Sequence, residues 1–179
     1  MDPLASAIVY ALSIATVIGQ ILAIFLFFTL VFRKKLGNNK HAKKIINLIS
    51  ENYITLIFVV GAMASAGSLS LSEIANFAPC KLCWYQRVFM YPIALISLTS
   101  LVFNEGRVKK FVLAFSTVGI LISVYHILMQ VFPKAFECSD EVAKCSAVQF
   151  AEFGYITIPV MSFTAFAIVL LISLLGREK

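Results

Sequence analysis

Five long apolar blocks separated by polar stretches constrain the fold of this chain more than any other feature. They run approximately over residues 4–32, 53–71, 84–103, 111–132 and 156–175. A helix of about 20 apolar residues crosses the hydrocarbon core of a bilayer, which is about 30 Å thick. Because 60% of the 179 residues are hydrophobic and only 13% are charged, a water-soluble fold of this size would leave much apolar surface exposed. We therefore predict an all-α membrane protein with five transmembrane helices.

Lysines and arginines are distributed unevenly between the segments that join these blocks. Six lie in "RKKLGNNKHAKK" after the first block, three in "NEGRVKK" after the third, and two in the final "GREK". In an alternating topology these eleven share one side of the membrane, and the other side holds only four, at Lys81, Arg87, Lys134 and Lys144. The positive-inside rule then places the amino terminus outside and the carboxyl terminus in the cytoplasm. Since this asymmetry explains the net charge of +6, we predict no nucleic-acid partner.

The first block differs from a cleavable secretory signal. It begins with "MDPLAS", which has an acid and no base, and it is longer than the roughly 7–15 residues of a signal's apolar region. We expect an uncleaved transmembrane helix, which a long basic cytoplasmic loop joins to the other four.

All four cysteines fall in the two segments predicted to lie outside. Cys80 and Cys83 follow the second block, and Cys138 and Cys145 follow the fourth. Disulfides persist in oxidising compartments, so this distribution is typical of two extracytoplasmic pairs. A disulfide between Cys80 and Cys83 would close a very small loop and gain little chain entropy, so stabilisation is a poor explanation for it. The C-x-x-C spacing is instead that of redox dithiols.

A zinc site and two inert disulfides are the alternative interpretations of these cysteines. Structural zinc pairs are usually spaced by about two to four residues, whereas six residues separate Cys138 from Cys145, and we predict no metal. Inert disulfides would suit a membrane scaffold or a small transporter. A transporter should show charged or broken helices near mid-membrane, and these blocks show little of that.

The stretch "PCKLCWYQRVFMYP" places a cation beside the first pair. If a helix begins near Cys83, its unpaired backbone amides and its dipole favour a thiolate there. Arg87 follows one helical turn later on the same face, and an arginine at the head of a membrane span must reach the interface or find an anionic partner. We expect Arg87 to stabilise negative charge on Cys83 or on a reduced ligand beside it.

A membrane quinone is the electron acceptor that suits a dithiol at the bilayer edge. The sequence has no G-x-G-x-x-G for a nucleotide cofactor, and Trp84 follows the C-x-x-C where c-type haem attachment needs histidine. A quinone pocket should be apolar and aromatic, with a few polar groups. Trp84 can contribute to its wall, while His126 and Gln130 lie four positions apart on one helical face near the same level. We therefore predict that Arg87, His126, Trp84 and Gln130 bind ubiquinone or menaquinone.

These motifs together resemble the DsbB/BdbC family of disulfide-forming membrane oxidoreductases. The resemblance covers roughly residues 53–175 and rests on "PCKLCWYQRVFMYP", "YHILMQ" and the second cysteine pair. It implies a four-helix domain over residues 53–179, preceded by an additional helix and the basic cytoplasmic loop over residues 1–52. It also implies a location in the bacterial plasma membrane, surrounded by membrane lipid. There, electrons would pass from an extracytoplasmic thioredoxin-like protein of the DsbA/BdbD type to a quinone.

The resemblance also assigns roles to single residues. Cys80 and Cys83 would form the pair next to the quinone, with the Cys83 thiolate facing the ring, while Arg87 and His126 would contact the quinone. The second pair, Cys138 and Cys145, would exchange disulfides with the thioredoxin-like partner. A vitamin K epoxide reductase-like enzyme is an alternative with a similar bundle, although in such enzymes the loop pair generally precedes the C-x-x-C.

Within the second pair, the resemblance favours Cys138 for the mixed disulfide with the partner. Cys145 would then relay electrons to Cys80. All four cysteines are catalytic in this interpretation, and they lie on the outer side of the membrane.

Overall fold

The computed structural model describes residues 2–32, 40–104, 107–132 and 145–176, apart from the side chains of 40–42. Within these residues the chain is helical and has no strand beyond one isolated bridge between Glu152 and Ile156. Five segments are long and apolar enough to cross a membrane. They are α1 (Pro3–Val31), α4 (Tyr53–Leu69) continued by the π-helical turn η1 (Ser70–Ile74), α5 (Lys81–Phe103), α6 (Lys109–Val131) and α7 (Ile158–Leu175). The prediction of an all-α membrane protein is confirmed.

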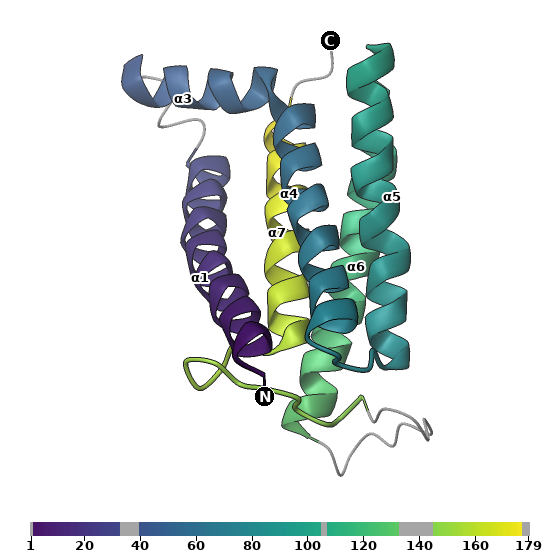
Figure 1. Cartoon of the computed structure of the whole chain (residues 1–179). Helices are drawn as coiled ribbons and strands as arrows, with labels where there is room; N and C mark the ends of the chain where they lie inside the picture. The colour runs from purple at the N-terminus through teal and green to yellow at the C-terminus, as the bar shows by residue number, and fades with distance from the viewer. Residues whose placement is uncertain (1, 33–39, 105–106, 133–144, 177–179) are drawn as a thin grey trace.

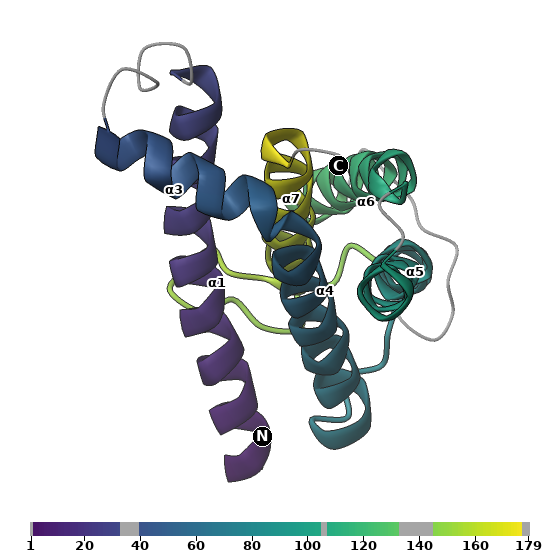
Figure 2. The same cartoon turned by 90° about the horizontal axis from the view of Figure 1, so that it is seen from above.

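Helix α7 lies at the centre of the arrangement. It packs against α6, α4 and α1, while α5 packs against α4 and α6 (Figures 1 and 2). Its inward side chains, which include Phe166, Val169 and Leu175, are fully buried. At the contact with α6, the ring of Phe166 lies against Gly119, where any Cβ would overlap it. Close approach of the two backbones therefore depends on a residue without a side chain.

An amphipathic helix, α3 (Lys40–Glu51), occupies part of the segment that was predicted to be a basic loop. It lies across one end of the bundle, transverse to the spans (Figure 1). Ile46 and Ser50 are buried, whereas Lys43 and Lys44 are exposed. The apolar stretch is too short to span a bilayer but long enough to give one apolar face, which suits a helix at the membrane surface.

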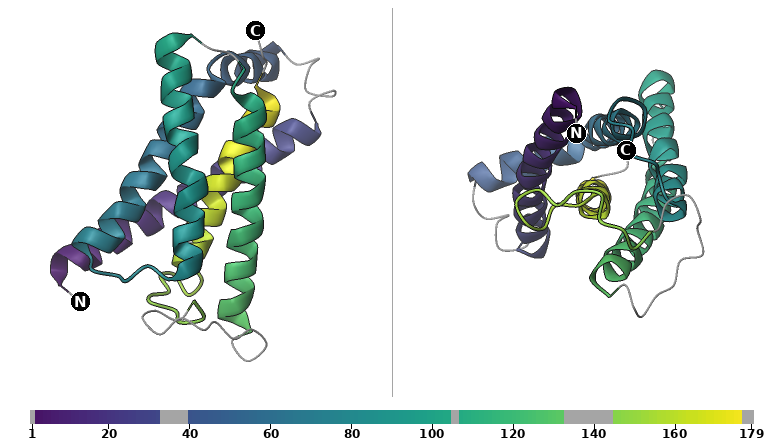
Figure 3. Two further views of the ribbon diagram at one scale, coloured as in Figure 1. Left: turned by 90° about the vertical axis from the view of Figure 1, so that its right-hand side faces the viewer. Right: turned by 60° about the horizontal axis from the view of Figure 1, so that its bottom comes forward.

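The other end of the bundle carries the cysteines that the structure describes. There the connection between η1 and α5 meets the segment over residues 145–157 that leads into α7 (Figure 3). The two segments are joined by a hydrogen bond of 2.8 Å from Gln149 Nε2 to the Ala78 carbonyl, and by the rings of Phe77 and Phe150, whose centroids lie 5.4 Å apart. This connection brings the two cysteine-bearing segments side by side.

Candidate active site

The C-x-x-C pair forms the amino-terminal cap of α5. Cys80 is the N-cap residue, and its Sγ accepts a hydrogen bond of 3.4 Å from the backbone N–H of Cys83. Cys83 is therefore the third residue of the helix, and the side chains at these two positions point toward each other as they do in a capping box. The two Sγ atoms lie 3.1 Å apart. The spacing thus places two thiols in contact at a helix end.

The two thiols have different surroundings. Cys80 is buried, whereas Cys83 is half-buried and lines a cavity of the protein. The hydrogen bond with Cys83, together with burial, raises the pKa of Cys80 to about 12. Cys80 therefore keeps its proton at neutral pH, and its Sγ lies within hydrogen-bonding distance of the Cys83 Sγ that faces the cavity.

His126 of α6 connects the pair to the second cysteine segment. Its buried ring places Nε2 3.7 Å from Cys80 Sγ and 3.2 Å from the carbonyl oxygen of Cys145. On the other side of the ring, Nδ1 lies 3.4 Å from the amide nitrogen of Gln86. Because the Gln86 N–H donates to Nδ1, the ring proton lies on Nε2 and is donated to the Cys145 carbonyl. His126 thus holds Cys145 next to Cys80.

Cys145 lies within the same cluster. It is buried and packs with Cys80 and Met129, and Leu82 and Cys83 complete the cluster. One cysteine of the second pair therefore lies beside the first pair. Cys138, the other predicted member, lies outside the described residues.

Arg87 lies one helical turn beyond Cys83 and is only 8% exposed. Its Nε donates to Ser68 Oγ and its Nη2 to the Ser68 carbonyl, both at 2.9 Å. The guanidinium carbon lies 5.1 Å from the ring centroid of Trp84. These partners orient the guanidinium, but all of them are neutral. A buried cation whose partners are neutral can bind an anionic ligand with little reorganisation.

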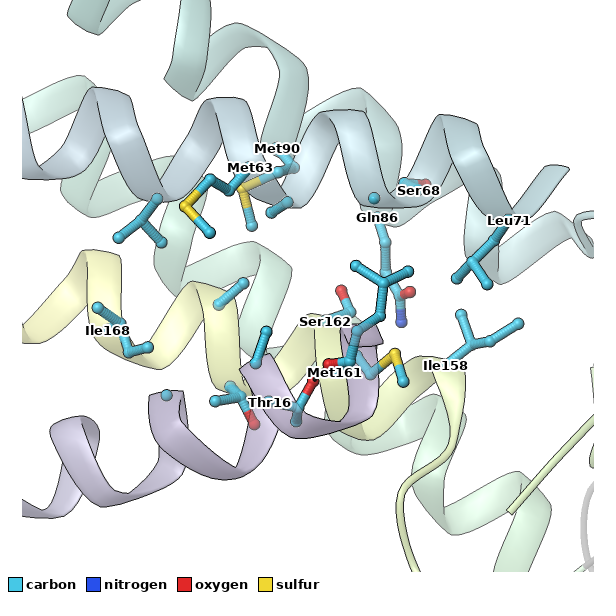
Figure 4. Close-up of a pocket in the computed structure, with 18 of the residues that line it drawn as sticks. Thr16, Met63, Ser68, Leu71, Gln86, Met90, Ile158, Met161, Ser162 and Ile168 are labelled. Atoms are coloured by element: carbon cyan, nitrogen blue, oxygen red, sulfur yellow. Dashed lines mark hydrogen bonds between the residues drawn. The ribbon is translucent and has the colours of Figure 1, made fainter. Parts of the chain in front are cut away.

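A cavity of about 550 Å³ opens beside these residues, between α1, α4, α5 and α7. Cys83, Gln86, Arg87 and Ser68 line one end of it. Figure 4 shows Gln86 and Ser68 toward this end, and Met63, Met90 and Ile168 toward the other. Its volume falls within the range of about 300–1,000 Å³ for small-molecule sites. The cavity can therefore hold an amphipathic ligand whose polar end lies at the dithiol.

Sequence comparison identifies the family to which this site belongs. The family model described as "Disulfide bond formation protein DsbB" matches residues 50–176. The chain belongs to the DsbB family. The family implies an oxidoreductase of disulfide bond formation, and the five apolar helices indicate a multi-pass membrane protein.

Three relatives of this DsbB-family protein illustrate the similarity. The disulfide bond formation protein C of Bacillus subtilis is 41% identical over 125 residues, which cover 68% of this chain and 91% of the relative. A probable disulfide formation protein C of Halalkalibacterium halodurans is 37% identical over 141 residues, 77% of this chain and 99% of the relative. A probable disulfide formation protein of Oceanobacillus iheyensis is 37% identical over 135 residues, which cover 70% of this chain and 89% of the relative. No solved structure matches the chain significantly.

Of the four residues predicted to bind a quinone, one lines the cavity of this DsbB-family structure and three do not. Arg87 lines the cavity. Trp84 is 54% exposed and lies outside the lining, because α5 turns Cys83, Gln86 and Arg87 toward the cavity. His126 also lies outside the lining, on the side of the thiols, and Gln130 is half-buried on α6 without contributing to the lining.

Two residues of the site were not predicted from the sequence. Gln86 is buried, lines the cavity and contacts His126. Its place in the sequence could have indicated a role in the site, because a polar residue inside a membrane span, three positions after Cys83, is unusual. Ser68, which holds Arg87, comes from a stretch of small residues on α4 that has no comparable signal.

The cluster also contains donors that suit zinc. The ligand atoms of Cys80, Cys83 and His126 lie within 4.8 Å of one another, and two thiolates with one imidazole form a zinc-binding set. Metal binding would require both thiols to lose their protons. Our expectation that the protein uses no metal stays a prediction.

Proposed function

We propose that this protein is a thiol:quinone oxidoreductase that reoxidises an extracytoplasmic thioredoxin-like dithiol oxidase of the DsbA/BdbD type. One observation carries the proposal: the half-buried Cys83 sulfur of the dithiol opens onto an apolar cavity, beside an arginine whose partners among the described residues are neutral. The cavity suits ubiquinone or menaquinone, either of which would accept two electrons and two protons. The matched residues 50–176 support a four-helix domain over residues 53–179, with residues 1–52 as an addition.

The thiols would act in sequence, beginning at the second pair. A thiolate of the reduced partner attacks Cys138 in a Cys138–Cys145 disulfide, forms a mixed disulfide and releases Cys145 as a thiolate. The second partner thiol then displaces Cys138, and the partner leaves oxidised. Cys145 next attacks Cys80 of the Cys80–Cys83 disulfide and releases Cys83. When Cys138 displaces Cys80, the second disulfide forms again and the first pair is left reduced. The packing of Cys145 against Cys80 supports this relay.

In the last step the first pair gives up two electrons. Cys83 would face the cavity as a thiolate and Cys80 would give up its proton as the Cys80–Cys83 disulfide forms again. The two electrons of the pair would pass to the quinone, which would take up the Cys80 proton and a second proton from the aqueous side. Arg87 stabilises negative charge first on Cys83 and then on the reduced quinone oxygen. His126 positions Cys145 and Cys80 through its hydrogen bonds.

We propose that the cysteine end of the bundle faces the outside of a bacterial plasma membrane, with the amino terminus on that side and the carboxyl terminus in the cytoplasm. Cys80, Cys83 and Cys145 lie at the end opposite α3, and α3 carries exposed lysines. At the α3 end, Lys109 donates a hydrogen bond of 2.7 Å to the Gly176 carbonyl. The positive-inside rule places such basic segments in the cytoplasm.

The test is oxidation of a reduced thioredoxin-like protein by the purified protein, with and without added quinone. We expect quinone-dependent oxidation that Cys80→Ser and Cys83→Ser each abolish, because no disulfide can form at the first pair. Val88→Ala, at an exposed position of α5 that does not line the cavity, should keep most of the activity. Full activity in both cysteine variants would refute the mechanism.

A further inference from the structure

Helix α1 forms one wall of the cavity, although it lies outside the residues that match the DsbB family. The family model begins at residue 50, and α1 ends at Val31. The lining residues from α1 are spread over more than three helical turns and include Leu12, Thr16, Gly19, Leu22 and Leu26. The opposite walls come from α4, α5 and α7. The cavity is therefore closed on one side by a helix with no assigned role.

The contacts of α1 are close enough to make it part of the fold. A Cβ on Gly19 would lie 3.2 Å from both Ile168 Cδ1 and Thr164 Cγ2 of α7. A Cβ on Gly67 of α4 would lie 2.9 Å from Leu12 Cδ2 of α1. Small residues thus let α1 approach both neighbouring helices, as they do in packed membrane helices. Figure 2 shows α1 beside α7.

The cavity is elongated along the bundle. On α7 its lining runs from Ile158 to Ile172, which corresponds to about 21 Å at 1.5 Å per residue. The redox end lies at the level of Leu12, because Leu12 contacts Gly67 and the next residue, Ser68, holds Arg87. Leu22 lies ten residues further along α1, about 15 Å from that level. A quinone ring alone does not need this length, but a hydrocarbon tail does.

Among the polar side chains that line the cavity beyond the redox end, two threonines are already satisfied, whereas the buried hydroxyl of Tyr91 has no hydrogen-bond partner among the described residues. Thr16 Oγ1 donates to the Leu12 carbonyl at 2.8 Å, and Thr164 Oγ1 donates to the Val160 carbonyl at 2.9 Å. Both residues therefore present mainly their methyl groups to a ligand. The polar groups at the redox end and the apolar surface beyond them match a ligand with a polar head and a long apolar tail.

We propose that α1 is the tail-binding wall of the site, which holds the isoprenoid tail of the quinone along Leu22 and Leu26. This inference rests on the proposed function, because it takes the ring of the same quinone to lie at Cys83 and Arg87. The additional helix would thus raise the affinity for long-tailed quinones without touching the ring.

A pair of tryptophan substitutions on α1 tests this role. Leu22 lines the cavity and is 41% exposed, whereas Ile24 is 57% exposed and does not line it. Leu22→Trp should fill the channel and raise KM for a long-tailed quinone about tenfold, which corresponds to losing the burial of roughly two methylene groups. KM for a tail-less quinone and kcat should stay unchanged. Ile24→Trp should leave both KM values unchanged.

Several results would overturn the inference. They are an unchanged KM for the long-tailed quinone in Leu22→Trp, an equal rise for both quinones, or a wild-type KM that does not depend on the tail. The last result would indicate that a lipid acyl chain occupies the channel. If the wild type reduces neither quinone, the proposed function itself fails, and that outcome is distinct from the other three.

Cross-linking gives a second measurement that needs no substitution. A quinone with a photoreactive group at the end of its tail should label peptides of α1 in the wild-type protein. A long-chain alcohol with the same photoreactive group should compete poorly for this labelling, because it lacks the ring. Labelling confined to other helices would overturn the inference.

Discussion

At the residue scale, the site depends on the unequal surroundings of two neighbouring thiols. The C-x-x-C spacing and the arginine after it could be recognised in the sequence, because both act within one helical turn. The raised pKa of Cys80 could be recognised only in part. Its largest cause, the hydrogen bond with Cys83, lies within the motif, but the burial that adds to it depends on residues far away in the chain, such as Met129 and Cys145. For the same reason, the sequence predicted a quinone contact for His126 and did not reveal its hydrogen bond to the Cys145 carbonyl.

Alkylation of the reduced protein should show this inequality. A thiol reacts as its thiolate, and the pKa of Cys80 is raised to about 12. Cys80 should therefore remain nearly unreactive from pH 7 to 10, and should react only as the pH approaches 12. Because the hydrogen bond with Cys83 is the largest cause of the rise, Cys83→Ala should lower the pKa of Cys80 and speed its alkylation at pH 8. The measurement is mass spectrometry of each cysteine against pH.

Equal alkylation rates at Cys80 in the wild type and in Cys83→Ala would contradict this account. Alkylation of the unfolded wild-type protein is the control, and there the two cysteines should react similarly.

Arg87 should contribute to quinone reduction through its charge and its fixed orientation. Arg87→Met should lower kcat/KM for quinone by about 30-fold to 100-fold, which corresponds to the loss of a charge-assisted hydrogen bond. Ser68→Ala removes one of the groups that hold the guanidinium, and should cost only several-fold. Steady-state kinetics against quinone concentration measures both effects. An Arg87→Met variant with wild-type kinetics would show that the cation serves only the membrane interface.

At the element scale, the five spans follow from apolar length alone, and their observed ends lie within about three residues of the predicted ones. The predicted span over 84–103 begins at Lys81 in the structure, because the Cys80 side chain caps the helix. The sequence did not reveal α3, whose short apolar face was counted with the basic loop. It also did not reveal the π-helical turn η1, which changes the helical register just before the cysteines.

The contact between α6 and α7 should be sensitive to any added side chain. Gly119→Ala places a methyl group against the ring of Phe166, and overpacking of this kind costs about 1–3 kcal/mol. Ala114→Ser, at an exposed position on the same helix, should have little effect. Thermal unfolding in detergent measures both variants. Equal melting temperatures for Gly119→Ala and the wild type would show that the helices can separate without cost.

At the scale of the whole molecule, the charge pattern predicted which ends of the spans lie together. The structure agrees in one respect, since Cys80, Cys83 and Cys145 gather at the end opposite α3. The packing of α1 against α7, and its share in the cavity wall, could not be predicted. The seven residues of α1 that line the cavity are apolar or small, as are nearly all the other residues of this helix. The composition of α1 therefore does not distinguish the face toward the cavity from the face toward lipid.

The central claim is that two electrons leave the Cys80–Cys83 pair for a quinone bound beside Cys83. The most direct measurement mixes the fully reduced protein, without oxygen, with one equivalent of quinone, and follows quinone absorbance together with the thiols by mass spectrometry. A Cys138→Ser/Cys145→Ser double variant isolates the first pair. We predict that one quinone is reduced for each disulfide formed. In the double variant this disulfide is Cys80–Cys83, whereas in the wild type it can pass on to Cys138 and Cys145. Unreduced quinone, or quinone reduction in the double variant without loss of the Cys80 and Cys83 thiols, would contradict the account.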